Sequence, residues 1–445
     1  MDREPTEKII TRFAPSPTGL LHGGNYRTAV FAYLFAKKMN GEFIIRIEDT
    51  DRQRSKKEYE DNIWETIEWL GLLPDRRFRQ SEHAGRHTEL LKKLIEEGKA
   101  YVSKEEIKKE GDRPEVIRFK NPNQSVTFVD VIRGPIMIDT TDLGDFVIAR
   151  SIEEPIFHFA VVVDDADEGV THIVRGEDHI SNTPRQILIQ EALGFQTPVY
   201  AHLPLVLDST RAKLSKRRGA KALTQYRDEG YLPEAVINYL ALLGWHPEGE
   251  QEVFSVSELI EAFTLDRIQK GAGIFDEVKL RWFNREHIKL LSDEDFDYRL
   301  SRFMESKGFV RPAYLREILP ILRERSETLA GAALESLEYD FLYSPILINR
   351  ELILKGAKAE SVDVLKHLEW LVATLSELSE EDFTAEKVKE LVFPYATDVG
   401  RSAVLWPMRV ALSGKVTSPD PFTLLSLLGR EKSIERLKKA LEMVQ

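Results

Sequence analysis

Apolar positions in the first 80 residues alternate between continuous runs and helical spacing. The runs are typical of buried strands, and steps of three and four residues are typical of amphipathic helices. The expected elements are a strand over 8–14, a helix over 25–39, a strand over 41–47 and a helix over 55–70 that ends at Gly71. Strands and helices that alternate at this spacing favour a parallel, nucleotide-binding sheet.

The pattern changes between Glu82 and Glu154. An expected helix over 86–97 leads into short β-like runs over 125–132 and 135–139, which indicate an insertion into the sheet. The parallel pattern then resumes with a strand over 157–163, a strand over 172–175 and a helix over 183–193.

Helical periodicity dominates the rest of the chain. A helix over 231–243 stops at Gly244, and from Val310 to Gln445 leucine recurs at steps of three and four residues. The sequence therefore predicts an α/β Rossmann-type domain with an inserted α+β subdomain, followed by all-α domains.

Composition narrows the class of protein. The 445 residues suit two to four domains, and 42% hydrophobic content is ample for their cores. No run of eighteen apolar residues exists, so no membrane span is expected. The first residues are acidic and polar, unlike a signal peptide, which predicts a cytoplasmic protein. Cysteine is absent, which excludes disulfides and thiolate zinc sites.

A net charge of −12 argues against nucleic-acid binding only if charge is averaged over the chain. Phosphate binding depends on local charge. The stretch from Arg211 to Lys221 holds six basic residues and no acidic one.

Two short motifs are suited to binding a nucleoside triphosphate. In Pro15–Asn25, Gly23 and Gly24 let the backbone approach an anion at a helix start, where His22 and Asn25 donate hydrogen bonds. In the basic stretch, Lys213 and Lys216 flank Ser215, so a mobile loop brings two ammonium groups to the phosphates. Magnesium is expected with ATP, although no dedicated ligand cluster is evident.

Together these motifs resemble the HIGH and KMSKS motifs of class I aminoacyl-tRNA synthetases. The flanking segments Arg12–Gly19 and Arg46–Asp51 are similar to the glutamyl branch, in which Asn often stands at the position of Asn25. The resemblance implies that the catalytic residues are His22, Asn25, Lys213 and Lys216. It also implies that these four and Gly24 bind ATP.

A glutamate substrate brings two carboxylates and one ammonium, which call for cations and an acid. Arg12 and Glu48 end two strands that a parallel sheet places side by side. The resemblance implies that Arg12 binds the side-chain carboxylate and Glu48 the ammonium. It further implies a pocket lined by Ala14 and Ser16, with Arg175 as a second cation.

The chain departs from this family at two places. Phe157 stands where many members carry Tyr, and a lost hydroxyl contact weakens substrate binding by roughly 1 kcal/mol. His158 could replace it, but on a strand it would point to the opposite face. The segment Tyr101–Glu105 lacks the cysteines of zinc-bearing relatives, so no zinc or other protein-bound metal is expected.

The resemblance extends over nearly the whole chain. Residues 273–284 are similar to a tRNA stem-contact region, and 407–414 and 427–431 to a helical anticodon-binding end. The expected domains are a Rossmann catalytic domain over 1–82 and 156–225, an inserted acceptor-binding subdomain over 83–155, a stem-contact domain over 226–309 and an anticodon-binding domain over 310–445.

The implied reaction is ligation of L-glutamate to tRNA(Glu) through a glutamyl-adenylate, by a monomer that activates glutamate only with tRNA present. Three alternatives fit parts of the pattern. A paralog that glutamylates a modified tRNA base would end near the stem-contact region. A glutaminyl enzyme would end in β-barrels, and a non-catalytic tRNA-binding protein would be expected to lose motif residues that this chain keeps.

The choice between tRNA(Glu) and tRNA(Gln) stays open. Their anticodons differ in the last nucleotide, and an arginine contact to a base edge is worth roughly 1–3 kcal/mol of discrimination. No arginine occurs between Glu351 and Gly400, and the expected helix over 364–378 offers only Lys366 as a cation. Either another residue, such as Arg401 or Arg409, reads this base, or the enzyme also charges tRNA(Gln). The sequence slightly favours the second explanation.

Overall fold

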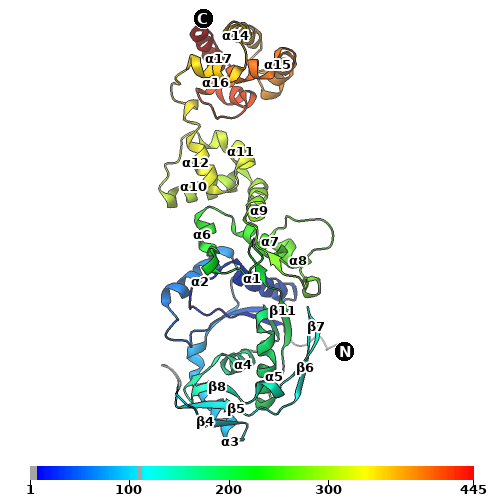
Figure 1. Cartoon of the computed structure of the whole chain (residues 1–445). Coiled ribbons are helices and arrows are strands. Elements are labelled where there is room, and N and C mark those ends of the chain that lie inside the picture. Colours follow the sequence, from blue (N-terminus) through cyan, green and yellow to red (C-terminus); the bar gives the residue numbers. More distant parts are fainter. Residues whose placement is uncertain (1–7, 108–112) are drawn as a thin grey trace. The chain divides into compact units, whose positions relative to one another are not determined.

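The chain divides into two compact units, one ending at Leu290 and the other spanning Leu291–Gln445. The structure is a computed structural model that describes residues 8–107 and 113–445. All sheets belong to the first unit, and the regular elements of residues 291–445 are helices (Figure 1).

A seven-stranded sheet forms the centre of the first unit, in the order β3-β2-β1-β10-β11-β6-β7. Its strands run parallel except β7, which pairs antiparallel with β6. The strands are β1 (Ile10–Phe13), β2 (Glu42–Ile47), β3 (Arg76–Arg79), β6 (Ser125–Asp130), β7 (Gly134–Asp139), β10 (His172–Gly176) and β11 (Val199–Leu203).

The segment expected to be an insertion contributes to two sheets. Its β6–β7 hairpin extends the central sheet, whereas the remaining strands form a separate antiparallel sheet in the order β4-β5-β8-β9. These strands are β4 (Ala100–Lys104), β5 (Glu115–Phe119), β8 (Phe146–Ser151) and β9 (Glu154–Pro155). A short pair, β12 (Val206–Leu207) with β13 (Gly273–Ile274), completes the described strands.

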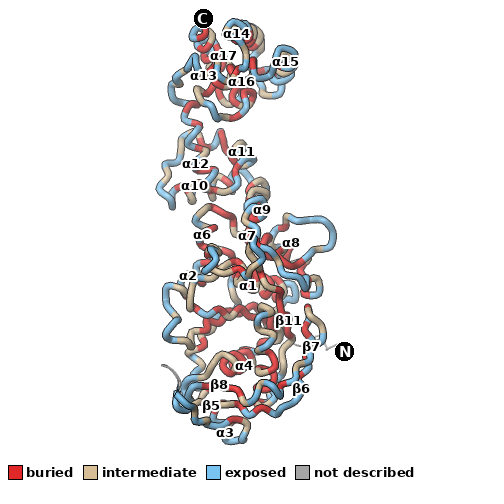
Figure 2. Tube along the Cα trace, in the orientation of Figure 1, coloured by how far each residue is buried: buried red, intermediate tan, exposed pale blue. Residues whose placement is uncertain are grey.

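Helices cover both faces of the central sheet, and buried residues are concentrated in the sheet and in the helix segments that face it (Figures 1 and 2). Because strand side chains alternate, β2 sends Phe43, Ile45 and Ile47 into the core under α1 and Ile44 into the core under α4 and α5. The helices of this unit are α1 (Gly23–Lys38), α2 (Lys57–Leu70), α3 (Ala84–Glu96), α4 (Phe157–Asp167), α5 (Thr183–Leu193), α6 (Leu223–Asp228), α7 (Pro233–Leu242), α8 (Val256–Ala262) and α9 (Glu277–Leu290).

The expected strand over 157–163 is wrong, because this segment is the first part of α4. Its residues from Phe159 to Asp165 are all buried, so the helix shows no polar face by which periodicity could identify it. A short apolar run bounded by polar residues does not distinguish a buried strand from a buried helix.

The second unit is a set of packed helices. They are α10 (Asp293–Lys307), α11 (Leu315–Arg325), α12 (Leu329–Leu337), α13 (Arg350–Ala357), α14 (Ser361–Ser376), α15 (Ala385–Val399), α16 (Arg401–Ser413) and α17 (Pro421–Val444). The helix α17 is kinked at Gly429, whose φ of 72° lies in the left-handed region that glycine tolerates. Among the helices of the described residues, none has the length and apolar character to cross a membrane.

Candidate active site

The residues expected to bind an amino acid lie at the carboxyl ends of three neighbouring strands. Arg12 belongs to β1, Arg175 to β10, and Glu48 directly follows β2. The hydroxyl of Thr11 donates to a carbonyl of α1, and Val174 joins the core on the α1 side. Because side chains alternate along a strand, Arg12 and Arg175 point to the opposite face, beneath α4 and α5.

Arg12 is held in place by α4. Its Nε donates to Oδ1 of Asp165 at 3.1 Å, and the two side chains are only 6% and 5% exposed. The loop after β1 is tied to the end of β2, because the backbone N–H of Glu48 donates to the carbonyl of Pro15 at 3.0 Å. The ends of the two strands are thus joined by both backbone and side chains.

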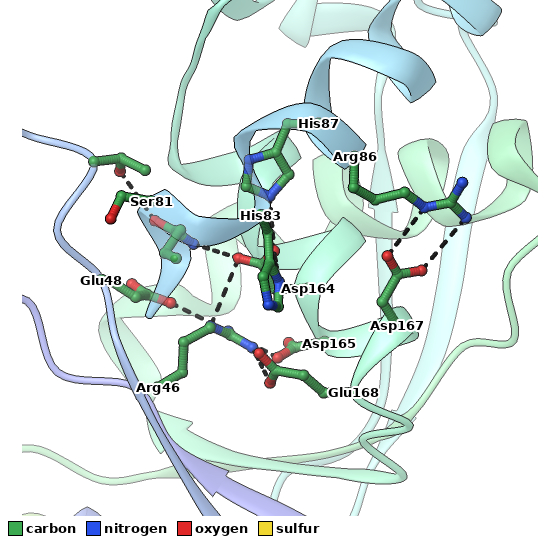
Figure 3. Close-up of polar contacts among 12 residues, drawn as sticks. Arg46, Glu48, Ser81, His83, Arg86, His87, Asp164, Asp165, Asp167 and Glu168 are labelled. Carbon is green, nitrogen blue, oxygen red and sulfur yellow. Dashed lines mark hydrogen bonds and ion pairs between the residues drawn. The ribbon is translucent and has the colours of Figure 1, made fainter. Parts of the chain in front are cut away.

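Arg46 lies between Glu48 and the carboxylates of Asp165 and Glu168 (Figure 3). It precedes Glu48 by two residues on the same face of β2, and its side chain is fully buried. Its Nη2 lies 3.2 Å from Oε1 of Glu48 and 2.9 Å from Oδ1 of Asp165, the oxygen that also accepts from Arg12. Its Nη1 lies 2.6 Å from Glu168.

The helix α4 and its C-cap residue Glu168 supply three of the four carboxylates around Arg46. Asp164, Asp165 and Glu168 occupy positions i, i+1 and i+4, so one side of the helix presents them to the strand. Asp164 also accepts from Nε2 of His87 at 2.7 Å. The cluster therefore connects β1, β2, α3 and α4.

Burial changes the protonation of this cluster. It raises the pKa of Glu168 to about 8, although the charge of Arg46 opposes this, so Glu168 is mostly neutral at pH 7. Burial also raises the pKa of Glu48 against the charges of Arg46 and Arg12. In Asp164 burial acts in the same direction, but the hydrogen bond from His87 and the charge of Arg46 hold the pKa below its usual range.

Arg175 is fixed by neighbours that leave one nitrogen unpaired. Its Nε lies 3.1 Å from Nε2 of His202, and its Nη2 donates to the hydroxyl of Thr183 at 2.8 Å. The buried Nη1 has no hydrogen-bond partner among the described residues. His202 is in turn held by Asp130 at 2.7 Å. Burial lowers the pKa of Arg175 to about 10, so its guanidinium stays charged at neutral pH and can bind a carboxylate.

The first triphosphate motif forms the start of α1, with His22 as its N-cap. Nδ1 of His22 accepts from the backbone N–H of Gly24 at 3.2 Å, and Oδ1 of Asn25 accepts from the N–H of His22 at 3.1 Å. This reciprocal arrangement fixes both side chains at the positive end of the helix dipole. A Cβ at Gly23 would lie 2.7 Å from the ring of Phe275, so only glycine fits there.

The second motif lies beside the first, although about 190 residues separate them in sequence. Burial and the charges of Lys216 and Lys213 together lower the pKa of His22 to about 4, so both ammonium groups lie close enough to act on its ring. Lys213 pairs with Asp178 at 2.8 Å. Lys216, which has no hydrogen-bond or ion-pair partner among the described residues, keeps its ammonium group available.

The remaining predicted residues surround this site to different degrees. Ala14 is half-buried and Ser16 is exposed in the loop after β1. Phe157 is the first residue of α4, and its ring lies 5.5 Å from that of His179 and 5.6 Å from that of His158. The strand argument against His158 therefore fails, because on a helix it is not turned to the opposite face from Phe157.

Sequence reasoning missed the residues that hold the predicted ones: Arg46, Asp165, His202, Asp130 and Asp178. A signal existed for Arg46, a charged residue inside the apolar run of β2, since a buried charge requires partners. The pair Asp164-Asp165 at the end of another apolar run carries the same signal. The pairing of particular acidic and basic side chains depends on contacts between residues far apart in the sequence, so the sequence alone could not predict it.

No metal centre accompanies these groups in the part of the chain that the structure describes. Within residues 8–107 and 113–445, no cluster of three or more His, Asp or Glu side chains has an arrangement that could hold a metal ion.

Comparison with known proteins identifies two families. Residues 8–113 and 103–282 match the family described as tRNA synthetases class I (E and Q), catalytic domain. Residues 296–441 match the family described as anticodon binding domain.

Individual relatives match over nearly the full length. A glutamate–tRNA ligase of Aquifex aeolicus is 42% identical, covering 98% of this chain and 99% of the relative, and one of Sulfurihydrogenibium is 38% identical, covering 97% and 98%. The crystal structure of a glutamate tRNA ligase from Elizabethkingia meningosepticum in complex with its amino acid superposes with a TM-score of 0.83 at 31% identity, covering 99% and 100%.

The first prediction concerns Lys216, whose unpaired ammonium lies near His22. Lys216→Ala should lower the rate of ATP-dependent activation by about 10²-fold or more, because it removes a cation that stabilises developing phosphate charge. Thermal unfolding should hardly change, since the side chain has few buried contacts. The matched control is Lys92→Ala, at an exposed lysine of α3. Near wild-type activation by Lys216→Ala would refute this role of the loop.

The second prediction concerns the titration of His22. Its pKa of about 4 in the folded protein lies below the ordinary value of 6.5, so the unfolded chain binds a proton first as the pH falls. Its contribution to stability is complete above pH 6.5 and is lost between pH 6.5 and 4. In His22→Asn, which keeps an N-cap acceptor, this loss is absent.

The measurement is the free energy of unfolding of both proteins at pH 7, 6, 5 and 4.5. The wild type should lose stability relative to His22→Asn over this range. A difference that does not change with pH would show that His22 titrates normally in the folded protein.

Proposed function

The chain belongs to the glutamate–tRNA ligases of the class I tRNA synthetases, and we propose that it activates L-glutamate as glutamyl-adenylate at this site before transfer to tRNA(Glu). Its reaction is the ATP-dependent ligation of glutamate to tRNA. The observation that carries the assignment of the site is the meeting of His22 with Lys213 and Lys216 beside the buried residues Arg12 and Arg175.

Glutamate binds in this proposal on the α4 face of the sheet. Arg12 takes the side-chain carboxylate, Glu48 lies near the ammonium, and the unpaired Nη1 of Arg175 is the second cation. Ala14, Ser16 and Phe157 line the pocket. The buried setting of these charges supports the assignment, because an incoming carboxylate would satisfy a donor that is otherwise unpaired.

ATP binds at the start of α1 and the lysine-rich loop. Gly24 and the helix N-terminus favour the phosphates, and His22 and Asn25 donate hydrogen bonds to them. Lys213 and Lys216 stabilise the negative charge that develops on the phosphate oxygens during the reaction. An oxygen of the α-carboxylate of glutamate attacks the α-phosphorus of ATP. Pyrophosphate then leaves with the magnesium that accompanies ATP. We expect no zinc in this enzyme.

The second step needs no protein nucleophile. A hydroxyl of the terminal ribose of tRNA attacks the acyl carbon, and AMP leaves. The enzyme contributes positioning and charge stabilisation. We further propose a cytoplasmic monomer with the domain boundaries expected from the sequence, in which 83–155 meets the acceptor end, 226–309 the stem and 310–445 the anticodon.

The third prediction separates the two small substrates. Arg12→Ala should raise the KM for glutamate by about 10²-fold or more and leave the KM for ATP within about threefold, because it removes the partner of one carboxylate. The measurement is tRNA-dependent pyrophosphate exchange at varied glutamate and ATP. Arg77→Ala, at an exposed arginine of β3, is the control. If instead the KM for ATP rose strongly and the KM for glutamate stayed unchanged, the two substrate positions would be reversed.

Recognition of the last anticodon nucleotide is the finer question. Arg409 is engaged, since its Nη2 donates to the carbonyl of Val416 at 2.9 Å and its guanidinium lies over Trp406. Arg401 is exposed at the start of α16, and its guanidinium lies 4.7 Å from the ring centre of Phe393. Arg401 is the better candidate of the two for a base-edge contact, but it is not braced by a buried partner.

The fourth prediction follows from this loose setting. We expect both tRNA(Glu) and tRNA(Gln) to be glutamylated, with a preference for the former below roughly a hundredfold, the span of one base-edge contact. The measurement compares kcat/KM for the two purified tRNAs. A larger preference would end the relaxed interpretation. If Arg401→Ala abolished that preference and Arg409→Ala did not, Arg401 would be identified as the reader of this base.

A further inference from the structure

Arg46 is fully buried and belongs to neither triphosphate motif, yet it contacts one proposed glutamate-recognition group, Glu48, and the ion-pair partner of the other, Asp165. One nitrogen, Nη2, lies 3.2 Å from Oε1 of Glu48 and 2.9 Å from Oδ1 of Asp165. The same Asp165 oxygen lies 3.1 Å from Nε of Arg12. Glu48 and Arg12 are therefore joined by an unbroken chain of contacts with only two members between them, Arg46 and Asp165, both buried. Figure 3 shows Glu48, Arg46 and Asp165 of this chain.

The backbone alone does not set the distance between the two recognition groups. Arg12 pairs in register with Ile44, so Glu48 lies four residues further along the neighbouring strand. Four residues of strand correspond to about 13 Å. The charged ends of Arg12 and Glu48 reach toward each other only through their side-chain torsions, and these torsions need fixing.

The geometry of Arg46 is suited to this task. Its guanidinium is planar and rigid, and it is surrounded by four carboxylates at 2.6 to 3.7 Å. The interior around it is close-packed, so a shift of one partner displaces the others. Asp164 is itself held by His83 and His87, at 3.1 and 2.7 Å. The frame is thus anchored to α3 as well as to α4.

We propose that Arg46 is a positioning residue that, through Asp165, fixes the spacing between Arg12 and Glu48 and so selects glutamate over its shorter homologue aspartate. The inference rests on the proposed function of this site. Aspartate has the same charged groups with one methylene less, so it can satisfy one recognition group but not both. A fixed spacing therefore lets the enzyme prefer glutamate over aspartate on the basis of one methylene, and preferences of this kind reach about 10- to 200-fold in enzymes.

The test uses the full-length protein and tRNA charging with glutamate or aspartate as the varied amino acid. Arg46→Lys keeps a buried charge but loses the planar fork that contacts Glu48 and Asp165 together. We expect the KM for glutamate to rise about tenfold or more and the glutamate-to-aspartate ratio of kcat/KM to fall about tenfold. The KM for ATP and kcat should stay within about threefold of wild type.

Two further variants separate positioning from loss of structure. Arg436→Lys removes a buried guanidinium of the second unit, which donates to the carbonyls of Leu412 and Phe341, and should lower stability without changing the glutamate-to-aspartate ratio. Asp165→Asn keeps the shape of the side chain but removes the charge that joins Arg46 to Arg12. It should reproduce the loss of discrimination, and it decides the matter if Arg46→Lys does not fold.

The outcomes are distinct. The test variants are Arg46→Lys and Asp165→Asn. If either of them folds and keeps both its KM for glutamate and its discrimination ratio within twofold of wild type, the inference is overturned. A fall in kcat alone would also overturn it, because it indicates less active enzyme rather than a relaxed spacing. If the wild-type protein charged no tRNA with glutamate in the same assay, the proposed function itself would fail.

Discussion

The buried guanidinium of Arg46 is the constraint on which the catalytic half depends. A charge taken out of water must be matched by partners at hydrogen-bonding distance, and a pair that loses one member destabilises a protein by about 3–5 kcal/mol. Here the match comes from Glu48 on the same strand and from three carboxylates of α4. The helix can supply them only in one position over the sheet, so satisfying this charge also fixes α4 above β1 and β2.

The same constraint divides the chemistry between the two faces of the sheet. Arg12, Glu48 and Arg175 face α4 and α5, where burial strengthens their interactions and water is excluded. His22 and Asn25 lie at the start of α1, on the other face, where the charges of Lys213 and Lys216 act on the ring of His22. Lys213 pairs with Asp178, just after β10, which joins the lysine-rich loop to the strand that carries Arg175. The charged residues that we propose for glutamate are thus buried beneath α4 and α5, whereas the residues that we propose for ATP lie at the start of α1 and in the lysine-rich loop.

Helical periodicity, a compact apolar run and a helix-ending glycine predicted several elements of the first unit. The helices α1 and α2 and the strand β2 follow from their spacing and from Gly71, whose φ of 68° closes α2. The helix α4 was predicted as a strand because its buried stretch has no polar side. The strands β4, β5 and β8 were not foreseen, and the β6–β7 hairpin proved to extend the central sheet, since pairing partners are a long-range property. Motifs predicted the residues of the site, whereas the acids and histidines that hold them depend on tertiary contacts.

The error at α4 also changes how the departure at Phe157 is understood. On a strand His158 would have faced away from the pocket, but adjacent residues on a helix are turned by only about 100°. Burial, together with the charges of Arg185 and Arg175, lowers the pKa of His158 to about 4, so its ring is neutral at pH 7. Its buried Nδ1 has no hydrogen-bond partner among the described residues. A neutral imidazole with spare hydrogen-bonding capacity therefore lies beside Phe157, the position at which the resemblance led us to expect a tyrosine hydroxyl, so this side of the proposed pocket is not apolar.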